Sequence, residues 1–103
     1  MLTHTVLFWG HDDLTGEQRA DFAAGLRTLP GIPTVSAGWV GTPAATDRGV
    51  VDRSYTFALS LRFEDLAAHD AYQVHPIHDA FHDRCSKYWK RVLVYDFDDL
   101  EPR

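Results

Sequence analysis

The stretch Ser54-Tyr55-Thr56-Phe57-Ala58-Leu59-Ser60-Leu61-Arg62-Phe63 decides the fold. Large apolar side chains occupy every second position from Tyr55 to Phe63, and small or polar side chains stand between them. Because successive side chains of a strand point to opposite faces of a sheet, this alternation predicts a strand with one face in a core. The segment is the clearest strand of the chain, and the remaining elements are interpreted around it.

Before this strand, the sequence predicts a strand, a helix and a second strand. Residues 3–9 are rich in β-branched and aromatic side chains, which is typical of a strand. Thr15 followed by Gln18 three residues later forms a capping-box pattern, and the helix that it begins is expected to end at a Pro-Gly pair. A second strand is expected over about residues 35–42, and residues 43–53 are typical of a loop.

After this strand, the sequence predicts a helical segment in two parts and a last strand. Asp65 is a suitable N-cap for a short helix that reaches about Gln73. Pro76 breaks that helix and begins the next one, with His75 as the cap-like residue before it. Residues 89–97 form the last strand. The order β-α-β-β-α-β predicts an α+β, ferredoxin-like domain, in which helices cover one face of a four-stranded antiparallel sheet.

The other face of this sheet would carry large apolar side chains with nothing to cover them. A second copy laid face to face would bury them, so the sequence predicts a homodimer whose two sheets form a barrel-like core. The residues expected on that face are Leu7, Trp9, either Trp39 or Val40, and either Val92 and Val94 or Leu93 and Tyr95.

The composition favours one ordinary globular domain spanning residues 1–103, with 45% hydrophobic and 24% charged residues. A formal net charge of -5 argues against nucleic acid as a partner, because phosphate-binding surfaces are basic. The single cysteine, Cys85, permits no disulfide within the chain. No apolar run approaches the roughly 18–20 residues of a membrane span, so a cytoplasmic protein with no membrane partner is expected.

The segment Tyr72-Gln73-Val74-His75-Pro76-Ile77-His78 carries the most suggestive chemistry. A tyrosine and a histidine that converge on a pocket can transfer protons near neutral pH. A metal site is the other interpretation, because His78 and His82 stand four residues apart on one helix. The segment lacks the glutamate of a His-Glu-x-x-His motif, so the sequence predicts no transition-metal site and no cofactor. A weakly held Mg²⁺ or Na⁺ on backbone carbonyls would leave no trace in the sequence.

Four segments together resemble the stress-responsive α/β-barrel (Dabb) family: residues 4–8, 26–33, 71–78 and 92–97. The most specific element is the His-Pro-x-His step preceded by a tyrosine. The resemblance implies a dimeric α/β barrel. One subgroup, typified by plant olivetolic acid cyclase, closes a linear polyketide thioester by aldol condensation without a cofactor. Similarity to that subgroup implies that Tyr72 and His78 transfer the proton and that His4 lies in the pocket. Phe57 stands where the subgroup has a further pocket histidine.

A set of mostly apolar side chains is the candidate lining of a cavity for a flat, apolar ligand, but a filled core is the first expectation for a domain this small. The set is His4, Val6, Phe8, Phe22, Leu26, Phe57, Leu59, Phe81 and Trp89. His11 and His69 are expected on the surface.

Three functions follow as hypotheses. The first is a small-molecule-binding barrel with cofactor-free, cyclase-like acid-base chemistry at Tyr72 and His78. The second is a non-catalytic stress-responsive oligomer with a filled interior, in which both side chains bond to the protein itself. The third is a cofactor-independent monooxygenase of polycyclic quinols.

Overall fold

The computed structural model describes residues 1–101, and its elements follow the order expected from the sequence. Two short 3₁₀ turns, Leu29–Gly31 and Ser86–Tyr88, precede β2 and β4. The strands and helices are β1 (Leu2–Gly10), α1 (Gly16–Leu26), β2 (Ala37–Gly41), β3 (Phe57–Phe63), α2 (Leu66–Gln73), α3 (Pro76–Cys85) and β4 (Trp89–Asp98). The strands pair antiparallel in the order β2-β3-β1-β4, which confirms the ferredoxin-like α+β class.

The helices begin where the local sequence predicts. The side chain of Asp65 accepts a hydrogen bond of 2.9 Å from the N–H of Ala68 and caps α2. His75 caps α3, because its Nδ1 accepts from the N–H of Ile77 at 3.1 Å. The split of the second helical segment at Pro76 is therefore confirmed.

Strand β2, expected over about residues 35–42, spans only Ala37–Gly41, and two further boundaries differ more. Helix α1 ends at Leu26, and the Pro-Gly pair expected to end it lies in the following 3₁₀ turn. Strand β3 begins at Phe57, three residues after the expected Ser54. The N–H of Ser54 donates instead to the Asp52 carboxylate at 2.8 Å, and this local bond competes with strand pairing.

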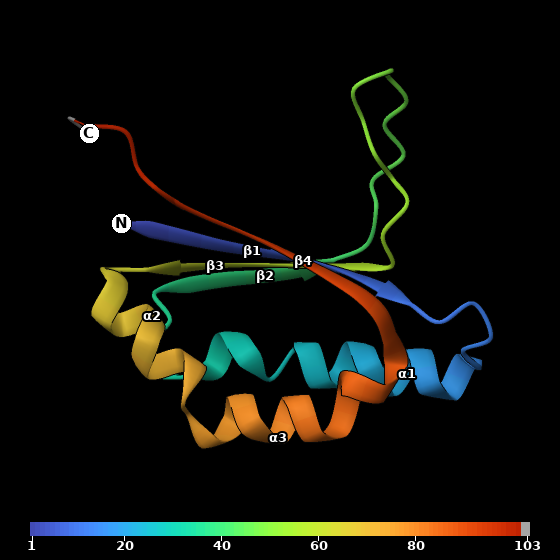
Figure 1. Ribbon diagram of the computed structural model, residues 1–103, viewed down its shortest axis with the longest axis horizontal. Coiled ribbons are helices and arrows are strands. Elements are labelled where there is room, and N and C mark those ends of the chain that lie inside the picture. The colour runs from blue at the N-terminus through green and yellow to red at the C-terminus, as the bar shows by residue number, and fades with distance from the viewer. Residues whose placement is uncertain (102–103) are drawn as a thin grey trace.

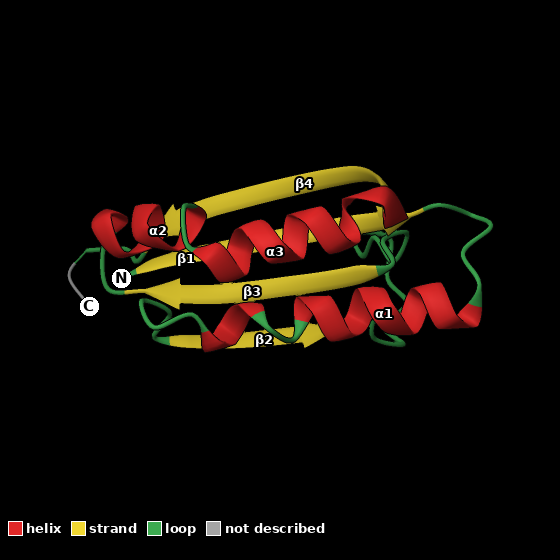
Figure 2. Ribbon diagram, turned by 90° about the horizontal axis from the view of Figure 1, so that it is seen from below, coloured by secondary structure: helices red, strands yellow, loops and turns green. Residues whose placement is uncertain are grey.

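The core lies between the helices and one face of the sheet (Figure 1). The strand register places an inward-facing row of β1 opposite an inward-facing row of β3, and all eight residues of the two rows are buried. The rows are Leu2, His4, Val6 and Phe8 of β1, and Phe63, Leu61, Leu59 and Phe57 of β3. Seen from the helical side, α1 lies over β2 and α3 lies over β1, whereas β4 forms the edge beyond α3 (Figure 2). The inward row of β4 is therefore only partly covered: Val92 and Val94 are 45% and 44% exposed.

Helices α1 and α3 approach closely. Gly25 makes this possible, because a Cβ at that position would overlap the Sγ of Cys85. At the exposed end of the contact, Arg84 donates to the Asp21 carboxylate at 2.9 Å through Nε, and the hydroxyl of Tyr88 donates to the same carboxylate at 2.8 Å. These hydrogen bonds lower the pKa of Asp21.

No helix covers the opposite face of the sheet, which we call the bare face; it carries large apolar side chains beside polar ones, and Ser54 of the β2–β3 loop contacts Trp9 at one end of it. The register places Trp39 rather than Val40 on it, and Leu93 and Tyr95 rather than Val92 and Val94. Trp39 and Tyr95 remain 59% and 58% exposed in the isolated chain. The loop between β2 and β3 rises from this same face (Figure 1). Within residues 1–101, no helix has the length and apolar character needed to cross a membrane.

Candidate functional site

A cavity of about 170 Å³ lies between the sheet and the helices. Strand β1 forms its floor, the edge strand β4 one side, and α2 and α3 its opposite wall. The lining residues are His4, Val6, Phe8, Leu29, Leu59, Tyr72, Gln73, His78, Phe81, His82, Trp89, Val92 and Val94. Polar groups gather at one end of the cavity and aromatic rings at the other.

Tyr72 stands in the last turn of α2 and is almost fully buried, with 1% of its surface exposed. Burial raises the pKa of its phenol well above the ordinary value, because the charged form loses its water shell. No side chain or backbone group within residues 1–101 makes a hydrogen bond with its hydroxyl. The hydroxyl is therefore a protonated donor that is free to bond a molecule in the cavity.

His78 lies in the first turn of α3, and its ring meets the Tyr72 ring edge to face at 5.0 Å between centroids. Burial lowers its pKa, with the nearby Asp79 carboxylate opposing the shift. The imidazole is neutral at pH 7 and carries a lone pair, so it can accept a proton. Neither ring nitrogen is hydrogen-bonded within the described part of the chain.

His4 is the third polar group of this end, on β1. Its ring lies 5.8 Å from that of Tyr72, and its Nδ1 lies 2.5 Å from Oδ1 of Asp96 on β4. An ionised carboxylate only accepts, so Nδ1 carries the hydrogen and Nε2 keeps the lone pair. Burial lowers the pKa of His4, and the hydrogen bond to Asp96 opposes that shift. Asp96 thereby fixes both the orientation and the tautomer of His4.

The apolar end is a wall of three aromatic rings. The rings of Phe8 and Trp89 are 5.1 Å apart, and those of Phe81 and Trp89 are stacked at 5.7 Å. Such rings offer flat contact area with little conformational freedom to lose. A planar, mostly apolar ligand is therefore the natural occupant of this end.

Most of the expected lining residues surround the cavity, but three do not. Phe22, Leu26 and Phe57 are absent from its wall and lie in the closed core. The rings of Phe22 and Phe57 pack against each other at 5.1 Å, and the Arg19 guanidinium covers Phe57 from outside at 4.9 Å. His82, considered as a metal ligand, is exposed at the rim.

Two residues of the polar end were missed by the sequence interpretation. His69 was expected on the surface, and this is wrong: its side chain is 13% exposed, and its ring lies 5.0 Å from that of His4. Asp96 was not considered at all. The signal for Asp96 was its place in the row Val92, Val94, Asp96, where a charged residue continues an otherwise apolar inward-facing series.

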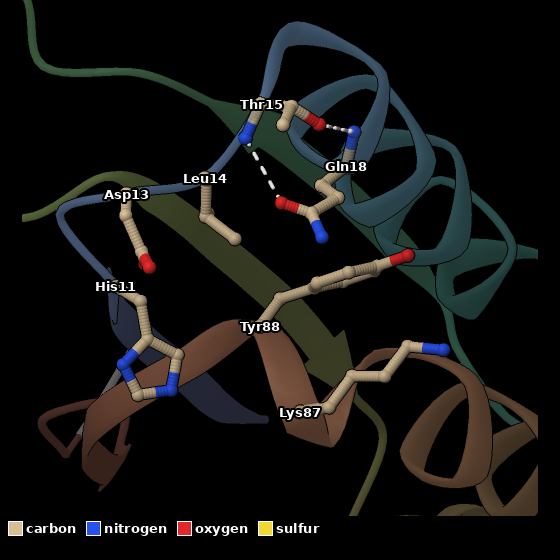
Figure 3. A pocket seen from close by; sticks show the side chains of 7 residues that line it. All are labelled: His11, Asp13, Leu14, Thr15, Gln18, Lys87 and Tyr88. Atoms are coloured by element: carbon tan, nitrogen blue, oxygen red, sulfur yellow. Dashed lines mark hydrogen bonds between the residues drawn. The ribbon is translucent and has the colours of Figure 1, made fainter.

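A wider hollow of about 500 Å³ lies at the start of α1, between its first turn and Lys87 and Tyr88 (Figure 3). The capping box already occupies two of the polar side chains there, Thr15 and Gln18. Thr15 Oγ1 accepts from the N–H of Gln18 at 3.1 Å, and Gln18 Oε1 accepts from the N–H of Thr15 at 2.9 Å. This hollow is a solvated groove without convergent reactive groups, so the smaller cavity is the candidate site.

The family follows from a comparison with known domains. The model of the Stress responsive A/B Barrel Domain (Dabb) matches residues 2–99. The chain belongs to this family. No curated protein matched the chain.

Solved structures share the fold of this Dabb chain. A protein from Arabidopsis thaliana is 22% identical with a TM-score of 0.81, and the match covers 100% of this chain and 99% of that one. A dimeric ferredoxin-like protein of unknown function from Thermobifida fusca is 26% identical with a TM-score of 0.76, over 93% and 88% of the two chains. A hydroxynitrile lyase from Passiflora edulis is 19% identical with a TM-score of 0.79, over 99% and 95%.

Proposed function

We propose that the cavity binds a small, largely apolar carbonyl compound and that Tyr72 and His78 transfer a proton on it. The observation that carries this proposal is a buried tyrosine whose hydroxyl makes no hydrogen bond within residues 1–101 and lines the cavity, beside a histidine whose pKa is lowered. A ligand oxygen in the cavity would supply the missing acceptor.

The two groups have complementary roles. Neutral His78 removes a proton from the carbon next to the carbonyl, and the electron pair moves onto the carbonyl oxygen. The Tyr72 hydroxyl donates a hydrogen bond to that oxyanion, and its raised pKa keeps the proton on the phenol. The enolate then attacks a second carbonyl carbon, which forms a C–C bond, and the new alkoxide takes the proton from His78.

The reverse reaction needs the same two groups. A base removes the proton of an alcohol, the adjacent C–C bond breaks, and the leaving carbanion is protonated. Hydroxynitrile lyases break such a bond with cyanide as the leaving group, and the Passiflora edulis enzyme of that name shares this fold. We therefore propose aldol-type C–C bond formation or cleavage as the reaction class.

The size of the cavity limits the substrate. Drug-sized ligands occupy roughly 300–1,000 Å³, whereas a dry cavity of about 150 Å³ holds one benzene ring. At about 170 Å³, this cavity matches a one-ring carbonyl compound better than a linear polyketide or the polycyclic quinol of a monooxygenase. Phe57, in place of the cyclase subgroup's histidine, lies in the closed core and so adds no polar group to the cavity wall.

The proposal is tested without knowing the natural substrate. Acetophenone has one ring, one carbonyl and exchangeable methyl protons, so deuterium incorporation from D₂O, followed by NMR, reports proton removal. The wild type should accelerate exchange, and His78→Ala should lose about 10²–10⁴-fold of that acceleration. Tyr72→Phe should lose about 10²–10³-fold, because it removes one oxyanion donor and little volume.

His11→Ala is the matched control, since His11 is exposed and lies outside the cavity. It should exchange at the wild-type rate. Exchange no faster than buffer, or full exchange by His78→Ala, would contradict the proposal and favour the non-catalytic oligomer. The open cavity and the Tyr72 hydroxyl without a hydrogen bond support the catalytic function over the non-catalytic oligomer, because a filled interior would contain neither.

We also propose that the bare sheet face binds a second copy of this chain. The support is its exposed aromatic residues, Trp39, Tyr95 and Phe97, together with the description of the Thermobifida fusca relative as dimeric. The cavity lies on the other side of the sheet, so its lining is complete within one protomer.

A further inference from the structure

We propose that His4, His69 and Asp96 form a binding site for a late first-row divalent metal ion, with Zn²⁺ as the reference ion. The site lies where β1, α2 and β4 meet, next to the polar end of the cavity. Each residue offers one ligand atom, and these atoms all lie within 4.8 Å of one another. Among residues 1–101, this is the one group of three or more such side chains that meets that condition.

The geometry is close to that of a bound ion. Zinc binds imidazole nitrogen at about 2.0–2.1 Å and carboxylate oxygen at about 2.0–2.2 Å, so tetrahedral ligand atoms stand about 3.4 Å apart. The pair His4 Nδ1 and Asp96 Oδ1 must therefore open from 2.5 Å by about 0.9 Å. The hydrogen that Nδ1 donates to Asp96 must leave at the same time, so that Nδ1 offers its lone pair to the ion and Nε2 carries the hydrogen. The Asp96 side chain is 42% exposed at the edge of the sheet, and this leaves it room to make that movement.

The rings of both histidines are already held in place beside the site. His4 is 5% exposed and fixed in the core. The Nδ1 of His69 lies 3.1 Å from the Asp70 carboxylate, and its Nε2 lies 3.3 Å from the Gln73 amide nitrogen. Asp70 therefore accepts the Nδ1 hydrogen, and the lone pair of Nε2 accepts a hydrogen bond from the Gln73 amide, which a metal ion would displace. A carboxylate behind the distal nitrogen is the usual support for a metal-binding histidine.

The chemistry of the three ligand atoms determines which metal ions the site can bind. Two imidazoles and one carboxylate suit zinc, copper, nickel, cobalt or iron, whereas magnesium and calcium prefer oxygen ligands alone. Three protein ligands leave a position for water, as in zinc sites that stay open to small molecules. The proposal is independent of the proton-transfer function, because none of its three ligands is Tyr72 or His78.

The test is binding of Zn²⁺ to the whole, untagged chain by isothermal titration calorimetry at neutral pH. The absorption spectrum of the Co²⁺ form then reports the coordination geometry. The wild type should bind one ion per chain. His69→Gln and Asp96→Asn should each weaken binding tenfold or more, and Asp70→Asn should weaken it about 10–100-fold through His69.

His82→Gln is the matched control, because His78 and His82 are the alternative pair of histidines on one helix face. It should leave binding unchanged. Absence of binding by the wild type, or loss of binding in His82→Gln with retention in His69→Gln, would overturn the proposal. If His69→Gln fails to fold, the exposed Asp96→Asn variant decides, with circular dichroism to establish its fold. Because the readout is binding, failure of the acetophenone experiment leaves this result unaffected.

Discussion

At the scale of the residue, burial shifts the pKa values of the two central side chains of the site in opposite directions. Burial raises the pKa of the Tyr72 phenol and lowers that of the His78 imidazole. Each shift favours the neutral form. At neutral pH, the phenol is therefore a donor and the imidazole an acceptor, which is the division of roles that proton transfer requires.

This division predicts a one-sided pH profile for the acetophenone exchange rate. His78 must be neutral to act, and its pKa lies below the ordinary 6.5. The rate should rise with pH to a midpoint below 6.5, after correction for exchange in buffer, and stay level past pH 10.0, because burial raises the pKa of the Tyr72 phenol above that ordinary value. A midpoint above 6.5, or a decline between pH 7 and 9, would contradict the assignment.

The sequence could predict this pair because both members belong to one short segment with a proline between them. It could not predict Asp96, which reaches His4 only through the pairing of β1 with β4. His69 was misplaced for a related reason. It was expected on the surface of a short helix, and its ring instead packs against His4 and against Phe63 at 5.5 Å.

At the scale of the element, the joint between α2 and α3 sets how the pair meets. His75 accepts the hydrogen bond from the N–H of Ile77, and Pro76 occupies the first helical position. These are local interactions, so the sequence predicted them directly. The end of α1 depends instead on how the 3₁₀ turn packs under β2, which is why its predicted boundary was wrong.

His75→Ala should lower the free energy of unfolding by about 1 kcal/mol, the usual cost of losing an N-cap. The measurement is urea denaturation followed by circular dichroism. It should also slow exchange, because the cap fixes the first turn that carries His78. Val74→Ala is the control, since Val74 is 76% exposed and should change stability by less than about 0.5 kcal/mol. Equal stabilities of the two variants would refute the role given to the cap.

Gly25→Ala should destabilise the protein by about 1–3 kcal/mol, because its Cβ would overlap the Sγ of Cys85 in the contact between α1 and α3. The double variant Gly25→Ala with Cys85→Ala should recover part of that loss. A double-mutant cycle from thermal or urea unfolding measures the coupling. Strict additivity of the two substitutions would show that the close approach is not the cause. Gly16→Ala, whose Cβ meets nothing within 4 Å, is the control.

At the scale of the whole molecule, the sheet separates two surfaces with different tasks. The helix-covered side holds the cavity, and the bare side holds aromatic residues suited to a second copy. The alternation of side chains was enough to predict the fold and the bare face. It could not decide which register each strand takes, because a shift of one residue exchanges the two faces.

Trp39→Lys with Tyr95→Lys should convert a wild-type dimer into a monomer, because both side chains lie on the bare face and a buried unpaired charge is costly. Sedimentation equilibrium measures the mass directly. Leu66→Lys is the control: Leu66 is 61% exposed on α2, on the helical side, and the variant should remain dimeric. A monomeric wild type at micromolar concentration would contradict the proposed assembly.

The hydrogen bond between His4 and Asp96 joins residues 92 positions apart, and this separation has a consequence for biosynthesis. A ribosome adds roughly 5–20 residues per second, so His4 waits roughly 5–20 s before Asp96 has been made. Until then, one edge of β1 has no partner strand, and its apolar row lies open to other nascent chains. The polar end of the cavity is therefore among the last parts of the molecule to assemble.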